Sequence, residues 1–209
     1  MTSARAVSVD PDVRRANRRL LRHLGFGRVP DDLGPAPAGP PRPAPEVVDR
    51  ALALHVVVRV AGGTGAAMAQ RWLDALDVRH ALHADEADYL LDAADDLRVE
   101  DAARATAAES LAVLLWTVGL LGDLPLEGPA VGATAVLPGP GDPVTSEVLD
   151  ARLRPEHELR AAHDLAAGMA WALRADPDLE VGAAPGSLDP YVVRQRQRAL
   201  RWVLGDPWS

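Results

Sequence analysis

Apolar residues recur at intervals of three and four along most of this chain, the spacing that places side chains on one face of an α-helix. A first helix is predicted to begin at Asp10-Pro11 and to end near Gly25, because Asp caps helix starts, Pro suits the first helical position and Gly suits the residue after the end. Similar patterns cover residues 46–61, 66–78, 83–97, 100–121, 155–177 and 189–205. No alternating strand pattern persists, so we predict an all-α fold, a compact multi-helix, bundle-like domain.

Residues 27–45 interrupt the helical pattern with seven prolines. Proline fixes φ and lacks an N–H group, so this segment is expected to be extended, without helix or strand. The predicted organisation is an N-terminal basic helix over residues 1–26, a Pro-rich linker over 27–45 and an all-helical domain over 46–209. The linker is expected to strap the first helix onto the body.

The passage AAESLAVLLWTVGLLGDLP, residues 107–125, is the most apolar part of the chain. Charged residues at Glu109 and Asp123 confine the apolar run to fewer residues than the roughly 20 that a membrane span needs. A helix that is apolar all round is otherwise a core helix of a soluble bundle, so we predict a core helix and no membrane association.

Glu109 lies at the polar edge of that helix and is expected to be at least partly buried. An unpaired buried carboxylate costs several kcal/mol, so it needs a partner. We expect an ion pair with Arg196 on the last helix, with Arg198 or Arg104 as alternatives, and a structural pair is favoured over a catalytic carboxylate.

Composition narrows the classes of function. All 22 basic residues are Arg, Lys and Ile are absent, and Asn occurs once, which points to a high-GC genome in which Arg replaces ordinary surface Lys. The net charge of −8 argues against nucleic-acid binding. The absence of Cys excludes disulfides and thiolate metal sites, and no apolar leader is present, so a cytoplasmic location is expected.

Two motifs imitate cofactor and metal sites. Gly62, Gly63 and Gly65 follow an apolar run, as in a dinucleotide fingerprint, but Arg59 interrupts the run and Met68 stands where Gly or Ala is needed. We therefore predict a helix–turn–helix and no cofactor.

Histidines do not form a convincing metal site either. His83 and Glu86 straddle a predicted helix start, where their spacing suits a capping box. His157 and His163 are six residues apart, whereas a zinc-protease helix needs a spacing of four. No metal is expected.

Charge is unevenly distributed along the chain. Residues 74–101 carry ten carboxylates against two arginines, while the first and last helices have basic faces. Attraction within the chain, or ordinary solvated faces, is the simplest explanation, and a partner-binding surface is the alternative. The arginines concerned are Arg14, Arg15, Arg18, Arg19 and Arg22, and Arg194, Arg196, Arg198 and Arg201.

Three segments, QRWLDALDVRHALHADEADYLL, AAESLAVLLWTVGLLGDLP and VVRQRQRALRWVLGDPW, resemble in order and spacing the bacterial family called domain of unknown function 4272. The resemblance covers roughly residues 12–208 and implies no activity. The family pattern falls on Trp72, Leu73, Glu86, Glu109, Trp116, Gly119, Arg196, Ala199, Leu200 and Trp202. The chain departs from it at His83, at Gln195 and at a tryptophan expected before Glu109, departures that suit caps and packing better than catalysis.

The leading hypothesis for function is a non-enzymatic protein that binds a protein partner, with an accessory or immunity-like role, and a homo-oligomer is also compatible. An exposed aromatic patch of Tyr191, Trp202 and Trp208 would favour it. The alternative is a hydrolase or transferase with a cleft around Glu109, His163, Asp164 and Arg196.

Overall fold

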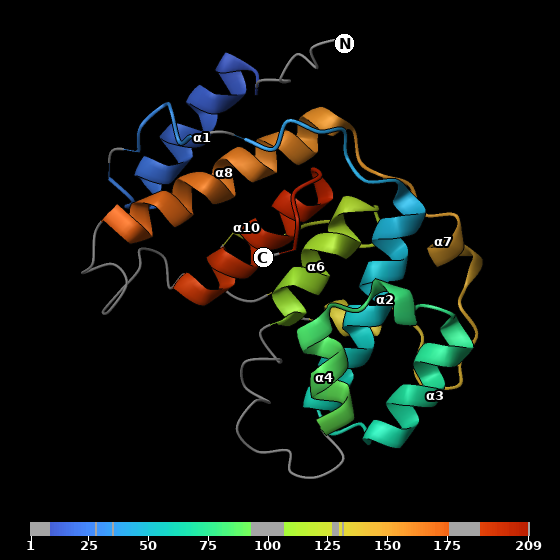
Figure 1. Cartoon of the computed structure of the whole chain (residues 1–209). Coiled ribbons are helices and arrows are strands. Elements are labelled where there is room, and N and C mark those ends of the chain that lie inside the picture. Colours follow the sequence, from blue (N-terminus) through green and yellow to red (C-terminus); the bar gives the residue numbers. More distant parts are fainter. Residues whose placement is uncertain are drawn as a thin grey trace, which may run out of the picture. The chain divides into compact units, whose positions relative to one another are not determined.

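The computed structural model describes residues 9–27, 29–34, 36–92, 107–126, 130, 132–175 and 189–208. Within these residues the chain forms eight α-helices and two 3-10 helices and no strand, which confirms the all-α prediction (Figure 1). The α-helices are α1 (Pro11–His23), α2 (Ala44–Ala61), α3 (Ala66–Leu76), α4 (Ala84–Asp92), α6 (Ala107–Thr117), α7 (Ser146–Leu149), α8 (Glu156–Ala175) and α10 (Pro190–Val203). The 3-10 helices are η1 (Arg79–Ala81) and η2 (Ala133–Ala135).

The chain divides into two compact units. Unit 1 comprises residues 1–42, 125–129 and 154–209, and unit 2 comprises residues 43–124 and 130–153. The division expected from the sequence, at residues 26 and 45, concerns which parts fold independently, and it stays a prediction.

In unit 1, α8 lies between α1 and α10 (Figure 1). The core between the helices contains Leu21 of α1, Met169 of α8 and Val193 of α10, all buried. α1 and α8 approach closely at Gly168, where a Cβ atom would lie 2.5 Å from Leu21 Cδ1. The N-terminal helix is therefore packed into the core of unit 1.

The proline segment, defined here as residues 29–42, is held to unit 1 by arginine side chains. Arg160 of α8 donates to the carbonyl oxygens of Pro37 and Gly39, both at 2.9 Å. Arg42 donates from its backbone N–H to the Val203 carbonyl at 2.8 Å and from its side chain to the Trp202 carbonyl at 2.8 Å. Proline carbonyls remain free acceptors although proline has no donor, so guanidinium groups can fix this segment without a strand or helix.

The start of α2 differs from the prediction. The linker was expected to remain extended to residue 45, but α2 begins at Ala44 with Pro43 as its N-cap residue. Pro45 lies in the first turn, where backbone N–H groups have no partner within the helix, so proline is tolerated there.

Unit 2 is organised around α2, which contacts α3, α4, α6, α7 and η1. Twelve residues of α2 are buried, and α6 buries every residue from Glu109 to Leu115. This confirms that the apolar passage is a core helix. In the part of the chain that the structure describes, no helix is long and apolar enough to cross a membrane.

Several expected boundaries need correction. The helix predicted over residues 100–121 ends at Thr117 as α6, because Gly119 adopts a φ of 77° and turns the chain, while residues 100–106 lie outside the described part. No helical pattern was identified between the predicted helices of residues 100–121 and 155–177, but this part of the chain includes η2 and α7.

Candidate functional site

Asp164 of α8 is a buried carboxylate surrounded by donors from α1. Arg18 donates to both of its oxygens, at 3.2 Å each, and Asn17 Nδ2 donates to Oδ2 at 3.0 Å. Arg14 Nε lies 3.5 Å from Oδ1. Two guanidinium groups therefore share one carboxylate, which leaves an excess of positive charge at this point of unit 1.

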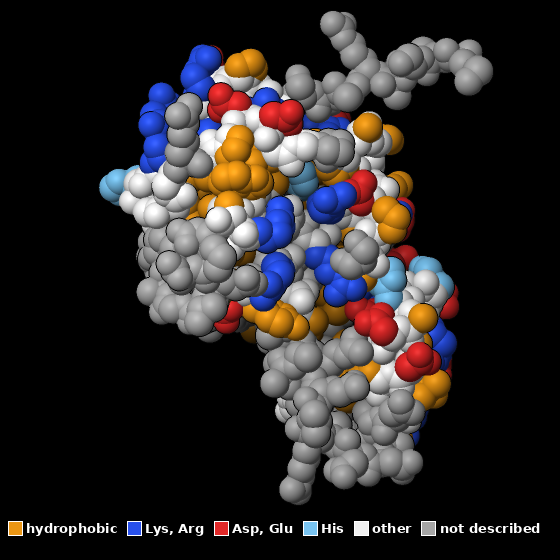
Figure 2. Space-filling view, turned by 60° about the vertical axis from the view of Figure 1, so that its left-hand side comes forward, with side chains coloured by type: hydrophobic (Ala, Val, Ile, Leu, Met, Phe, Trp, Pro, Cys, Tyr) orange, Lys and Arg blue, Asp and Glu red, His pale blue; other side chains and the backbone are white. Residues whose placement is uncertain are grey.

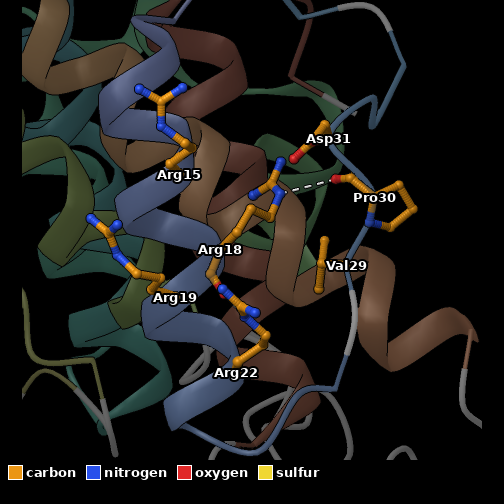
Figure 3. A pocket seen from close by; sticks show the side chains of 7 residues that line it. All are labelled: Arg15, Arg18, Arg19, Arg22, Val29, Pro30 and Asp31. Carbon is orange, nitrogen blue, oxygen red and sulfur yellow. Dashed lines mark hydrogen bonds between the residues drawn. The ribbon is translucent and has the colours of Figure 1, made fainter.

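A cleft of about 550 Å³ lies beside this ion pair, between α1 and the proline segment (Figure 3). We call it the arginine cleft. Its lining residues are Arg15, Arg18, Arg19, Arg22, Val29, Pro30 and Asp31.

The four arginines of this cleft differ in what they bind. Arg18 extends from α1 to the proline segment, where its Nε donates to the Pro30 carbonyl at 2.9 Å (Figure 3). Arg15 pairs with Asp12, which is itself exposed. Arg22 donates a hydrogen bond from Nε to the Arg18 carbonyl. Arg19 makes no hydrogen bond or ion pair with the described residues.

Arginine side chains follow α1 along the upper left edge of Figure 2. Of the four in the cleft, Arg18 is buried, whereas Arg15, Arg19 and Arg22 are exposed. The cleft is therefore lined by three exposed arginines and by the buried Arg18, side chains suited to binding carboxylates or phosphates.

A second cleft of unit 1, of about 490 Å³, contains His163 and is called the histidine cleft here. The polar side chains in its wall come from α1, α8, α10 and the start of the proline segment. They are Arg14, Asp31, Asp32, His163, Asp164, Gln197 and Arg201, and the apolar wall includes Val9, Leu33, Ala36, Pro37, Ala38 and Ala167.

His163 is 6% exposed, and its Nε2 atom has no hydrogen-bond partner among the described residues. Burial, reinforced by the nearby positive charge of Arg201, lowers the pKa of His163 from 6.5 to about 4. The imidazole is therefore neutral at pH 7, with one nitrogen as donor and the other as acceptor.

The candidates for an enzyme site are only partly brought together. His163 and Asp164 line the same cleft, but both oxygens of Asp164 accept from Arg18. Arg196 belongs to unit 1, where it donates to the Pro125 carbonyl, and Glu109 belongs to unit 2. The charge pair expected between Glu109 and Arg196 stays a prediction.

Glu109 is 5% exposed, which confirms its predicted burial. Its Oε1 accepts from the Ala130 backbone N–H at 2.8 Å. Only arginines were expected as partners of Glu109, so this backbone donor was not predicted.

The residues singled out by the family resemblance lie mainly at packing and helix-end positions. Trp72 and Leu73 are buried in α3, and Ala199, Leu200 and Trp202 are buried in α10. None of the ten residues lines either of the two clefts.

Glu86, one of these ten residues, has a clear structural role. It forms a buried, bidentate ion pair with Arg50 of α2, with both hydrogen bonds at 2.6 Å. Its Oε2 also accepts from the His83 backbone N–H at 3.1 Å, the half of the predicted capping box that needs no side chain from His83. Glu86 therefore joins α4 to α2.

Tyr191, Trp202 and Trp208 do not form the exposed aromatic patch that was considered from the sequence. Trp202 and Trp208 are 6% and 9% exposed, and their rings contact each other edge to face with centroids 5.8 Å apart. Arg42 lies over the Trp202 ring and Arg198 over the Trp208 ring, at 4.6 and 4.7 Å from the centroids. Tyr191 alone of the three is exposed.

The arginine cleft was not predicted from the sequence, and the histidine cleft was predicted only in part, through His163 and Asp164. Arg18 was grouped with the other arginines of the basic face, although it precedes the buried Leu21 by three residues and so lies on the same helix face. That position was the available signal that one arginine would be buried. Within the described residues no group of three or more His, Asp and Glu side chains is arranged to hold a metal ion.

Residues 14–209 match the model of a protein family described as Domain of unknown function (DUF4272), which confirms the resemblance of the three sequence segments. No curated protein and no solved structure was found to match the chain.

Proposed function

The chain belongs to the DUF4272 family, and from the geometry of unit 1 we propose that it is a binding protein whose arginine cleft takes an acidic segment of a partner protein. The observation that carries this proposal is the row of Arg15, Arg19 and Arg22, exposed in one cleft whose lining includes one carboxylate, that of Asp31, while Asp12 pairs with Arg15.

The spacing of these arginines makes the row unfavourable without a partner. Arg15 and Arg19, and Arg19 and Arg22, stand four and three residues apart on α1, so their charges are neighbours. Like charges at these spacings destabilise a helix by a few tenths of a kcal/mol per pair. An anionic segment bound in the cleft would reverse the sign of this contribution.

Carboxylates of a protein fit this cleft better than a nucleic acid does. Unit 1 contains 15 arginines and 13 carboxylates, and the whole chain has a net charge of −8. The negative net charge of the whole chain repels an extended polyanion such as DNA. A short acidic segment interacts mainly with the arginines of the cleft. Guanidinium groups bind carboxylates through two parallel hydrogen bonds, which gives geometric selectivity.

A labelled acidic peptide tests the proposal. A short fluorescein-labelled peptide of alternating Asp and Glu should bind the whole chain, measured by fluorescence anisotropy at low salt, and the same peptide with Asn and Gln should not. The double variant Arg19→Gln/Arg22→Gln should weaken binding roughly tenfold, as expected for the loss of two exposed charge pairs.

A matched variant controls for net charge. Arg59→Gln/Arg71→Gln changes the total charge equally but removes exposed arginines of unit 2, so it should leave binding unchanged. Equal weakening by the two double variants would overturn the proposal. So would tighter binding of a short DNA duplex at Arg19 and Arg22, or a dimer of this chain that only Arg19→Gln/Arg22→Gln dissociates.

The hydrolase or transferase alternative has less support. A carboxylate that orients a catalytic histidine must accept from the imidazole, and the oxygens of Asp164 are engaged by Arg18. The shared cleft of His163 and Asp164 is better suited to binding.

A further inference from the structure

The histidine cleft is a second concave site in unit 1, and the arginine cleft does not explain it. Its volume of about 490 Å³ falls in the range of small-molecule sites. The apolar wall of Leu33, Pro37 and Ala167 faces the same space as several polar side chains. Apolar walls with a few polar groups are typical of sites that bind small organic ligands.

Two of these polar groups lack partners in the described part of the chain. His163 Nε2 is buried without a hydrogen bond, and the Gln197 side chain makes none that the structure shows. Buried polar atoms in folded proteins are nearly always hydrogen-bonded, so the unpartnered Nε2 is a feature that a bound ligand would explain.

Arg14 is the side chain of the cleft that can pair with an anion, in a wall that also contains Asp31, Asp32 and Asp164. Asp164 lies 3.5 Å from Arg14 but accepts its hydrogen bonds from Arg18 and Asn17, so the charge of Arg14 is only partly neutralised. The Arg14 side chain is 35% exposed and lines the cleft. Arg201 adds little, because Asp206 holds it at 2.6 Å, and the carboxylates of Asp31 and Asp32 are exposed to solvent at the cleft.

We propose that the histidine cleft binds a small organic carboxylate that also carries a hydrogen-bonding group. Its carboxylate pairs with Arg14, its apolar body packs on Leu33 and Pro37, and its polar group bonds to His163 Nε2 and the Gln197 amide. This site is independent of the proposed partner site, because it uses neither Arg19 nor Arg22.

The probe for this proposal is 4-hydroxybenzoate, which carries a carboxylate, a flat apolar ring and a hydroxyl group. For a compound of about ten non-hydrogen atoms, we expect a Kd of roughly 1 mM. Binding is followed by the imidazole signals of the whole chain in ¹H–¹³C NMR spectra, with His163 assigned by its loss in His163→Phe. Benzoate should bind several-fold more weakly, and 4-hydroxybenzamide should give no saturable shift.

Variants separate a site from general anion attraction. Arg14→Gln should weaken binding of 4-hydroxybenzoate by roughly fivefold or more, in line with the loss of a charged hydrogen bond. The control His157→Phe changes an exposed histidine of the same helix and should leave the affinity unchanged. Gln197→Leu, at a half-buried position of α10, carries the test if His163→Phe does not fold.

The proposal is overturned if 4-hydroxybenzoate gives no saturable shift of His163, or if benzoate and the amide bind equally well. It is also overturned if Arg14→Gln leaves the affinity unchanged. The acidic peptide is tested with variants of Arg19 and Arg22, and 4-hydroxybenzoate is tested with Arg14→Gln. A negative result for one ligand therefore does not affect the interpretation of the other.

Discussion

Asp164 is the carboxylate on which the contact between α1 and α8 depends. Replacing it by Asn would leave Arg18 buried beside a neutral side chain, and removing one member of a buried pair costs about 3–5 kcal/mol. Asp164→Asn is expected to lower the free energy of unfolding by that amount in urea denaturation of the whole chain.

Asp12→Asn is the matched comparison, because Asp12 pairs with Arg15 at the surface. Exposed pairs contribute under about 1 kcal/mol, so this variant should be close to the parent. Similar losses in the two variants would show that the Asp164 pair is not desolvated as the structure indicates.

Two buried histidines make stability depend on pH. Burial is the main cause that lowers the pKa values of His55 and His163 from 6.5 to about 4. Between pH 6.5 and pH 4 the folded chain therefore binds fewer protons than the unfolded chain. The free energy of unfolding is highest above pH 6.5 and decreases as the pH falls toward 4.

His163→Gln should reduce the change in unfolding free energy between pH 7 and pH 5 by about 2 kcal/mol, since each pKa unit corresponds to about 1.4 kcal/mol. The measurement is urea denaturation at a series of pH values. The exposed His157→Gln should retain the parent slope. An unchanged slope in His163→Gln would mean that His163 titrates normally in the folded chain.

At the scale of single residues, the site was harder to predict than the fold. Whether a charged side chain is buried depends on a partner that can lie far away in the sequence. Arg15, Arg18 and Arg22 are identical in type and stand three and four residues apart, yet only Arg18 of these three reaches a buried carboxylate, 146 residues later in the chain. Glu109 was correctly expected to be buried because its neighbours in sequence are apolar, whereas its backbone partner Ala130 comes from a loop.

At the scale of elements, Gly168 sets the distance between α1 and α8. A Cβ atom there would lie 2.5 Å from Leu21 Cδ1 and 3.1 Å from Arg18 Nη1. Leu21 is fully buried and Arg18 is held by Asp164, so neither side chain can move without loss. Overpacking typically costs 1–3 kcal/mol, more than the roughly 1 kcal/mol that Ala gains over Gly within a helix.

Gly168→Ala is therefore expected to lower the melting temperature of the chain. Gly65→Ala serves as the control, because no atom lies within 4 Å of its Cβ position. A stabilised Gly168→Ala variant would indicate that α1 and α8 are farther apart than described.

Removing α1 together with the proline segment is a harsher test of the same contact. A chain lacking residues 1–42 would leave Asp164 without Arg18 and Arg160 without its carbonyl acceptors. We expect this deletion to lose more helical signal in circular dichroism than α1 alone contributes. A deletion variant that loses only the helical signal of α1 and still melts cooperatively would instead support the division of the chain at residues 26 and 45.

Helix starts were predicted well because they are local. Asp10 and Asp189 each accept a hydrogen bond from the backbone of the first turn, and a proline follows each of them. Helix ends inside apolar sequence were predicted less well, since Leu120 and Leu121 continue the apolar pattern of α6 although Gly119 has already turned the chain. The short α7 has four residues, too few to produce a periodic pattern.

At the scale of the whole molecule, charge is divided between the two units. Unit 2 contains 7 arginines and 17 carboxylates, against 15 and 13 in unit 1. The sequence showed this asymmetry only as an acidic stretch and two basic helices, because the division into units depends on contacts between distant segments.

A double-mutant cycle on Glu109 and Arg196 tests whether the two units are energetically coupled. Each residue is at most 7% exposed, and we expect Glu109→Gln and Arg196→Met each to destabilise the chain by more than about 2 kcal/mol. If the residues form the charge pair expected from the sequence, the double variant should lose clearly less than the sum of the two. Additive losses, measured by urea denaturation, would show that the two positions are independent.

The contact between Trp202 and Trp208 has an optical consequence. Two indole rings 5.8 Å apart, inclined at 84° and buried beside Arg42 and Arg198, have electronic transitions that couple strongly. Coupled transitions of this kind divide the circular dichroism of the pair into bands of opposite sign, on top of the helical spectrum. Because both rings belong to unit 1, this couplet would report when Trp208 separates from Trp202, even while the helices of unit 2 remain folded.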